Sequence, residues 1–521
     1  MLSISSRPRA SALVAGAWVG TWIVAGAAAV LPAQAEVPIS GLSPYLVDGS
    51  ESDFAAVTRC NGAPQAGNLF RNSESEPHLA VNPVNRANMI SSWHQDRWSS
   101  GGAQGLGAAY TIDGGTTWQP VTIPFTRCSG AQARSSGDYE RASDPWVSFG
   151  PDGTAYLMGL VTDNSVNENA MVVARSSDDG VSWSAPVVIV RSPAQDPTLR
   201  SLFHDKNSIT ADPFDPNYVY ATWTVFRLRS WSVMFSRSTD KGLSWSAPRP
   251  IATLNVEQPP EQAYFRQGAQ VIVLRDVGGN PTLLNVYYRL VFNPRTGEER
   301  TEQSVLRSTD QGKSWSRVDL PIATFRGATA VDIERGIPVR DAGTLPSAAA
   351  NPTTGYAYVA WQARRSDGRV GVNISVSSDG GRQWSAPVRV NQGSAEDVQA
   401  FLPIVAVNQD GTVGVLFYDF RNDQPGDPSL STDVWLSVFT PELGFVREWR
   451  LTSSSFDMRM SALTQRGYFP GDYVGLASDG EDFVAAFTRT NNVGTPAAWP
   501  PGSGVVDPRD RQSIVFARQA P

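Results

Sequence analysis

The stretch Ser176-Ser-Asp-Asp-Gly-Val-Ser-Trp-Ser-Ala-Pro186 returns along the chain in recognisable form. Its core, Ser/Thr-x-Asp-x-Gly-x-Ser/Thr-Trp, occurs near 111–118, 176–183, 238–245, 308–315 and 377–384, with Gln383 replacing the hydroxyl residue in the last copy. The copies follow one another at intervals of about 60 to 70 residues, a spacing typical of chains built from repeated supersecondary units. The sequence therefore predicts one repeat architecture.

The residue types of this repeat indicate a structural role. An Asp and a hydroxyl residue can bond nearby backbone groups and hold a tight turn. The Gly supplies the positive φ that such a turn needs. The Trp begins the next strand and packs a large ring between sheets, so Trp245→Ala is expected to cost about 3–5 kcal/mol of stability. We therefore interpret the five aspartates as turn residues rather than catalytic ones.

Polar turns between apolar strands recur at nearly the same interval as the repeats. They lie at 82–83, 150–153, 212–217, 276–280, 351–355, 408–411 and 478–482. Each unit then reads as four short strands, which is the composition of a propeller blade. The predicted fold is an all-β propeller over 71–521 with seven blades, and six blades are the alternative. The last unit lacks a strand, and the segment 36–70 is a candidate to supply it, for example through Phe54–Thr58.

Residues 1–35 are predicted to be a signal peptide. Arg7 and Arg9 precede an apolar run, and Ala33-Gln-Ala35 fits a cleavage site. The mature protein is expected to be secreted or periplasmic, not inserted in a membrane, and monomeric. Two cysteines in an exported chain predict one disulfide, Cys60–Cys128.

Charge and histidine spacing argue against several function classes. The net charge is −7, and without a basic block nucleic acid is not an expected partner. The three histidines, His78, His94 and His204, have no metal-ligand spacing, so neither a zinc site nor a cofactor is predicted.

Polar residues should gather at one mouth of the propeller. Connections that enter the first strand of each blade, or leave the second, share one face, and loops held by such a scaffold carry function. Before the first strands lie Arg71, Glu74, Glu76, Asp138, Tyr139, Glu140, Asp144, Asp205, Arg266, Tyr468 and Asp472. After the second strands lie Asp96, Arg97, Arg227, Arg229, Arg289, Arg364, Arg365, Asp419, Arg421 and Asp423. Arginines clamp carboxylates and acidic side chains act as general acids and bases, so an acidic sugar is the predicted ligand.

The repeated stretch is similar to the Asp-box, or BNR repeat, and the chain resembles the sialidase-like Asp-box propellers. That resemblance implies three arginines on a substrate carboxylate, a Tyr nucleophile assisted by a Glu, and an Asp acid/base. Trp93-His-Gln-Asp96-Arg97 precedes the first box as the acid/base segment of sialidases does. Phe70-Arg71 resembles their Phe-Arg-Ile-Pro motif, although Asn72-Ser73 follow here.

Position along the repeat completes the set that the resemblance implies. Arg266 and Arg364 are candidates for the second and third arginines, and Tyr468 for the nucleophile with Glu140 as its partner. Arg97 and Arg421 are further substrate-binding candidates. Asp419, in Tyr418-Asp419-Phe420-Arg421, is a rival acid/base. The cluster of Asp419, Asp423 and Asp427 could bind calcium through its oxygens, but without a calcium-loop spacing a solvated loop is favoured.

The leading functional hypothesis is an exported sialidase-like glycoside hydrolase of the exo-α-sialidase type, acting on an acidic glycan. A polysaccharide lyase or a two-carboxylate glycosidase on the same fold is the second hypothesis. A non-catalytic propeller that binds glycan or protein is the third, because one fold hosts all three.

Overall fold

The computed structural model describes residues 36–45 and 67–521, with gaps at 164–165, 167, 193–201, 228–229, 253–262, 277, 342, 394, 396–397, 494, 499, 502–505 and 508. The predicted signal peptide, Cys60 and Phe54–Thr58 lie outside the described residues, so cleavage and the Cys60–Cys128 disulfide stay predictions. Within the described ranges every regular element is a strand, apart from the short 3-10 helix η1 (Met458–Met460). The all-β prediction is confirmed. No helix of these ranges has the length and apolar character needed to span a bilayer.

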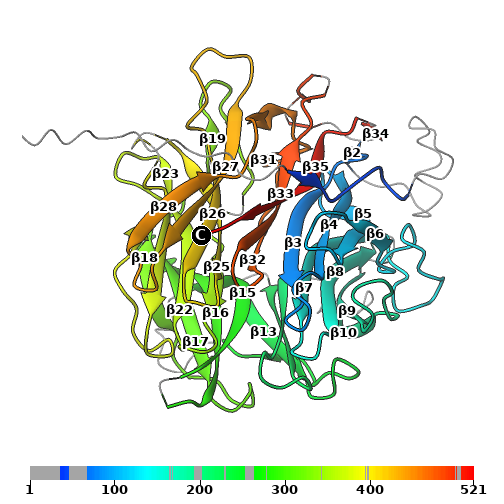
Figure 1. Cartoon of the computed structure of the whole chain (residues 1–521), viewed down its shortest axis with the longest axis vertical. Helices are drawn as coiled ribbons and strands as arrows, with labels where there is room; N and C mark the ends of the chain where they lie inside the picture. The colour runs from blue at the N-terminus through cyan, green and yellow to red at the C-terminus, as the bar shows by residue number, and fades with distance from the viewer. Residues whose placement is uncertain are drawn as a thin grey trace, which may run out of the picture. The chain divides into compact units, whose positions relative to one another are not determined.

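Most strands form antiparallel groups of four, labelled in Figure 1. The first three groups are β3 (Ser75–Val81), β4 (Met89–Trp98), β5 (Ala103–Thr111) and β6 (Gln119–Thr122); β7 (Arg141–Phe149), β8 (Ala155–Asp163), β9 (Glu168–Ser176) and β10 (Val187–Arg191); and β11 (Phe203–Ala211), β12 (Val219–Arg227), β13 (Ser230–Ser238) and β14 (Arg249–Pro250). One further pairing, Ala103 with Ala142, joins the first group to the second.

The next three groups repeat the pattern. They are β15 (Ala263–Arg275), β16 (Pro281–Phe292), β17 (Glu299–Ser308) and β18 (Leu320–Phe325); β21 (Ser347–Ala350), β22 (Ala357–Arg364), β23 (Val370–Ser377) and β24 (Val388–Arg389); and β25 (Ala400–Val407), β26 (Val413–Asp419), β27 (Ser431–Phe439) and β28 (Phe445–Arg450).

The last group takes strands from both ends of the chain. It contains β32 (Gly475–Ser478), β33 (Phe483–Thr490) and β35 (Gln512–Gln519), and β1 (Val37–Pro38) pairs with β35 as the fourth strand. The sequence suggests Phe54–Thr58 for that place, but β1 occupies it. Short strands outside the groups are β2 (Leu69–Phe70), β19 (Val331–Asp332), β20 (Ile337–Pro338), β29 (Phe456–Asp457), β30 (Leu463–Thr464), β31 (Gly467–Tyr468) and β34 (Val506–Asp507).

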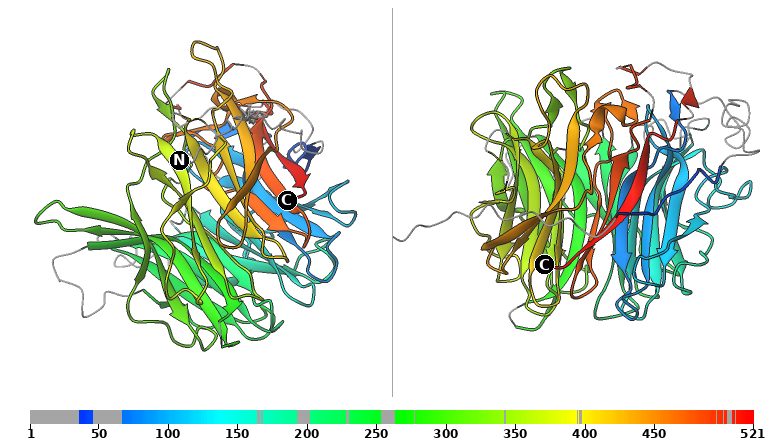
Figure 2. Two further views of the ribbon diagram at one scale, coloured as in Figure 1. Left: turned by 60° about the vertical axis from the view of Figure 1, so that its left-hand side comes forward. Right: turned by 45° about the horizontal axis from the view of Figure 1, so that its top comes forward.

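The first strands of the seven groups touch one another in a closed cycle. β3 contacts β7, β7 contacts β11, and the series continues through β15, β21, β25 and β32, which returns to β3. Figure 2 shows the red strands of the last group beside the blue strands of the first. Residues far apart in sequence are therefore brought together wherever these seven strands begin.

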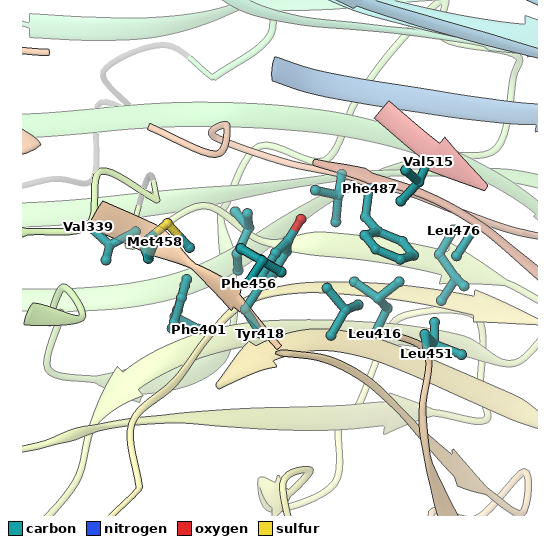
Figure 3. Close-up of a cluster of buried hydrophobic side chains, with 14 of the residues drawn as sticks. Val339, Phe401, Leu416, Tyr418, Leu451, Phe456, Met458, Leu476, Phe487 and Val515 are labelled. Carbon is teal, nitrogen blue, oxygen red and sulfur yellow. The ribbon is translucent and has the colours of Figure 1, made fainter. Parts of the chain in front are cut away.

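Apolar side chains pack between neighbouring groups. Leu160 and Met171 of the second group pack with Ile209 and Trp223 of the third. In the cluster of Figure 3, Leu416 and Tyr418 of β26 pack with Leu476, Phe487 and Val515 of the last group. Strands covered on both faces should read as nearly continuous apolar runs. β8, Ala-Tyr-Leu-Met-Gly-Leu-Val-Thr-Asp, has that composition and is buried along almost its whole length.

The repeated sequence stretches form hydrogen-bonded turns. In the third copy the Ser238 hydroxyl donates to Asp240 Oδ1 at 2.7 Å and accepts the Gly242 N–H at 2.8 Å. Asp240 Oδ1 also accepts the Ser244 N–H at 2.9 Å, and Gly242 has a φ of +75°. Trp245 is partly buried against the core between the second and third groups. The loss of stability expected for Trp245→Ala is therefore smaller than the about 3–5 kcal/mol expected for a fully buried ring.

Candidate active site

Three neighbouring inner strands carry the same bulge where they begin. The pairing of β3, β7 and β11 with their second strands shifts between Ser75 and His78, Ser143 and Trp146, and Asp205 and Ser208. The bulged residues Glu76, Asp144 and Lys206 have φ values of 54°, 53° and 53°. Residues with a Cβ rarely adopt this region, and bulges re-aim side chains beside active sites. The shared bulge turns these three residues toward one place.

The bulged residues meet in a buried charge cluster. Lys206 Nζ lies 2.5 Å from Asp472 Oδ2 and 3.4 Å from Asp144 Oδ2, and Arg340 Nη2 lies 3.1 Å from Asp472 Oδ2. The Asp472 N–H donates to Glu76 Oε1 at 2.9 Å. Burial alone would raise the pKa of Asp472, but the charges of Arg340 and Lys206 outweigh it and hold that pKa well below its usual range. Asp472 is thus an ionised anchor.

His94, from β4, joins the cluster. Its Nε2 atom lies 2.9 Å from Glu76 Oε2 and accepts the Asp144 N–H at 3.0 Å. Glu76, His94 and Asp144 offer ligand atoms within 4.8 Å of one another, close enough to hold a metal ion. Because the Asp144 N–H already engages the His94 Nε2 lone pair and the Lys206 ammonium lies beside Asp144, we assign no metal to the group.

The cluster borders two adjoining cavities that share Asp205, Lys206, Arg340 and Arg466. The first, of about 560 Å³, is also lined by Glu76, His94, Arg97, Arg141, Asp144 and Phe203, and is called the arginine cavity. The second, of about 730 Å³, is also lined by Phe226, Trp231, Gln267, Asp341 and Asp472, and is called the tryptophan cavity. Each has the size of a small-molecule site.

Three arginines, Arg97, Arg340 and Arg466, line the arginine cavity. The guanidinium carbons of Arg97 and Arg340 lie 4.4 and 4.5 Å from the centroid of the Phe469 ring. Burial and the charge of Arg340 lower the pKa of Arg97 to about 9, and the charge of Arg340 is the main cause that lowers the pKa of Arg466. Within the described residues the Nε atoms of Arg97 and Arg340 have no hydrogen-bond partner. This positive cluster suits an anionic ligand.

Two carboxyl groups beside these arginines titrate in opposite directions. Burial, helped by the charge of Asp144, raises the pKa of Asp205 to about 7 even though Lys206 opposes it. Burial also disfavours the Asp144 carboxylate, but the charge of Lys206 lowers its pKa below the usual value. A protonated carboxyl beside an ionised one is the division of roles that acid–base catalysis needs near neutral pH.

Of the nine site residues predicted from the sequence, Arg97 alone lines the described part of either cavity. Asp96, the predicted acid/base, is fully buried and accepts hydrogen bonds from Ser43 Oγ at 2.6 Å and from the Asn72 N–H at 3.0 Å. Arg71 is buried too, and its N–H donates to the carbonyl of Asp507. Asp96 thus fixes the segment before β3 to the N-terminal segment.

Tyr468 makes a different contact from the one that the sequence predicts. Its hydroxyl donates to Asp332 Oδ2 at 3.3 Å, and its ring is buried in the same apolar cluster as Leu416 and Tyr418. Glu140 is buried at the start of the second group, where its N–H donates to the carbonyl of Thr162. The structure therefore pairs the Tyr468 hydroxyl with Asp332, where the sequence predicts assistance from Glu140.

The remaining candidates sit in ion pairs or at the surface. Arg266 Nη2 lies 2.8 Å from Asp319 Oδ2, and Arg364 is exposed at the end of β22. Arg421 Nη2 lies 2.6 Å from Asp419 Oδ2, and Arg421 Nη1 lies 2.5 Å from Glu448 Oε1. Burial raises the pKa of Asp419 to about 6. In the candidate calcium loop Asp423 accepts the Ser431 N–H while Asp419 is engaged by Arg421. Functional roles for these residues remain predictions.

Several lining residues escape the sequence prediction, namely His94, Arg141, Lys206, Arg340 and Arg466. The sequence does contain a signal for Lys206. When the repeats are aligned, Lys206 falls at the same position as Glu76 and Asp144, each of which precedes a proline. Arg340 and Arg466 lie in connections between the four-stranded groups, where repeat alignment gives no signal.

No family model matches the sequence, and no curated protein does. Solved structures similar to this chain include the Hadza microbial sialidase Hz136, at 13% identity over 87% of this chain and 92% of that chain, with a TM-score of 0.41. An α-L-arabinanase of Penicillium chrysogenum is 12% identical over 88% and 99%, with a TM-score of 0.38. An ulvan lyase is 11% identical over 81% and 93%, with a TM-score of 0.45.

Proposed function

We propose that this protein is an exported, monomeric, seven-bladed β-propeller that cleaves an anionic glycan. The closed cycle of contacts among seven first strands supports the propeller, and a six-bladed ring would leave one four-stranded group outside the cycle. Export rests on the apolar N-terminal segment and the Ala33-Gln-Ala35 site.

The observation that carries the proposal is the crowding of Arg97, Arg340 and Arg466 beside the arginine cavity. Like charges this close are costly, as the lowered pKa values of Arg97 and Arg466 indicate. A carboxylate or sulfate in the cavity compensates that cost and accepts the buried Nε donors. A neutral sugar can accept hydrogen bonds from these donors, but it brings no negative charge to Arg97 and Arg466.

Asp205 and Asp144 supply the chemistry in this proposal. Asp205 is protonated near neutral pH and donates its proton to the glycosidic oxygen as the bond to the anomeric carbon breaks. Asp144 is ionised and acts as the second carboxylate, so that water adds to the anomeric carbon in the net reaction. Lys206, between the two, keeps Asp144 charged.

Sialidase chemistry of the exo-α type needs a tyrosine at the reacting carbon, and the described lining of the two cavities contains none. The two-carboxylate route is therefore favoured. A lyase is the second candidate because His94 and Arg97 line the same cavity. An arginine can neutralise a uronate while a neighbouring base removes the adjacent proton. A lyase leaves an unsaturated product that absorbs ultraviolet light, and hydrolysis does not.

The test incubates the full-length exported protein with sialyllactose, hyaluronan, polygalacturonate and arabinan. New reducing ends and ultraviolet absorbance are followed together. The proposal expects reducing ends without absorbance from an anionic glycan, and a loss of about 10²–10⁴-fold in Asp205→Asn. Asp427→Asn, at an exposed position, is the matched control. Cleavage of arabinan alone, or full activity of Asp205→Asn, would contradict it.

A further inference from the structure

We propose that the substrate is a chain of at least two sugars lying across both cavities, with an anionic unit in the arginine cavity and an uncharged unit stacked on Trp231 in the tryptophan cavity. The inference rests on the proposed function and adds to it the substrate class and the place of the cut. The cleaved bond then lies over Asp205.

The shared wall sets the place of the cut. Asp205 and Lys206 line both cavities, so the group proposed to protonate the glycosidic oxygen stands where the two spaces meet. Volumes of about 560 and 730 Å³ each suffice for a separate small-molecule site. A chain that occupies both cavities therefore places a glycosidic bond at Asp205.

An aromatic wall runs along the tryptophan cavity. The ring centroids of Phe226 and Trp231 are 4.7 Å apart, and that of Phe265 lies 5.2 Å from Trp231. Phe203, which is 39% exposed and faces the arginine cavity, continues the wall with its centroid 6.3 Å from Phe226. Trp231 and Phe226 are only partly buried although they are large apolar groups. The apolar face of a sugar ring can cover such a surface.

Charge distinguishes the two cavities. Beyond the shared wall, the arginine cavity adds the cations Arg97 and Arg141 and the carboxyl groups of Glu76 and Asp144. The described lining of the tryptophan cavity adds no cation, and it adds the carboxyl groups of Asp341 and Asp472. Burial raises the pKa of Asp341 to about 7, whereas Asp472 stays ionised. The arginine cavity, with two further cations beside its two carboxyl groups, therefore accepts an anionic sugar better than the tryptophan cavity, whose further charged groups are all acidic. A polymer that alternates anionic and uncharged sugars fits this arrangement.

The experiment compares two anionic polymers as probes. Hyaluronan alternates a uronate with an uncharged amino sugar, and polygalacturonate is anionic at every unit. The expected kcat/KM is higher for hyaluronan by about 10-fold or more. Trp231→Ala is expected to lower kcat/KM on hyaluronan by about 10-fold, with Trp231→Phe retaining most of it. Trp449→Ala, at a distant partly buried ring, is the control.

The outcomes separate the two levels of the proposal. Equal rates on the two polymers would overturn the inference, while cleavage that depends on Asp205 would keep the proposed function. A Trp231→Ala variant that is folded by circular dichroism and cuts hyaluronan at the wild-type rate also overturns it. If no anionic glycan is cut at all, the proposed function fails and the inference fails with it.

Discussion

Asp144 and Asp205 share one hydrogen-bond donor, the backbone N–H of Lys206, which lies 3.0 Å from Asp144 Oδ2 and 2.8 Å from Asp205 Oδ1. The bulge of β11 sets this arrangement, because the positive φ of Lys206 directs its N–H toward both carboxyl groups. The Lys206 ammonium lies closer to Asp144, at 3.4 Å, than to Asp205, at 4.0 Å. One residue thus helps to hold Asp144 ionised while Asp205 keeps its proton.

Activity should depend on the protonation of Asp205. With its pKa raised to about 7, kcat/KM is expected to level off on the acid side of 7 and to fall as the pH rises through 7. The contribution of Asp205 to folding stability should also fall as the pH rises. The folded state binds more protons than the unfolded state between about pH 4, the ordinary Asp pKa, and pH 7, so stability falls across that window. A pH profile whose alkaline limb survives in Asp205→Asn would contradict this assignment.

Arg466 is expected to bind the anionic group of the substrate. It is exposed, so Arg466→Ala should fold normally while KM for an anionic glycan rises by about 10-fold. The difference between wild type and variant should shrink at high salt. Arg369→Ala, at an exposed arginine on the β22–β23 connection, is the control. An unchanged KM together with an unchanged salt dependence would argue against the anion site.

Two of the tryptophans in the core between the second and third groups should differ in how much stability is lost when each is replaced by alanine. Trp223 is fully buried, so Trp223→Ala should lower the free energy of unfolding by about 3–5 kcal/mol. Trp245 is only partly buried, so Trp245→Ala should cost about 2 kcal/mol. Denaturant unfolding of both variants measures this difference. Equal losses of unfolding free energy would show that the Trp245 ring is as well packed as the Trp223 ring.

Asp96 is expected to stabilise the fold rather than to take part in catalysis. Its carboxylate accepts from Ser43, Asn72 and Gln95, so Asp96→Asn turns an amide N–H toward those donors and should cost about 1–3 kcal/mol. Thermal unfolding and kcat/KM are measured on the same preparation. A loss of activity of about 10²–10⁴-fold with an unchanged Tm would instead support the acid/base role that the sequence predicts.

The sequence was most informative where residues repeat. The Gly242 turn, the polar turns and the apolar strands recur along the chain, so the all-β fold and the spacing of its strands could be read directly. The site could be located by region but not by residue. Glu76, Asp144, Asp205, Asp472 and Arg97 were all among the residues expected at the mouth.

The remainder of the site depends on contacts that no local pattern encodes. Lys206 meets Asp472 across 266 positions of sequence, and Arg340 meets the same carboxylate across 132. Asp96 and Arg266 were plausible from their places in the repeat, yet burial against Ser43 and Asp319 gives them structural partners. Closure of the strand cycle decides which charged groups meet, and sequence spacing does not report it.

The most direct test of the proposal is the turnover of an anionic glycan by wild type, Asp205→Asn and Asp427→Asn, measured as new reducing ends at pH 6. The expected result is full activity for wild type and Asp427→Asn, with a loss of about 10²–10⁴-fold for Asp205→Asn at an unchanged Tm. A folded Asp205→Asn variant that cuts the same glycan at the wild-type rate would contradict it.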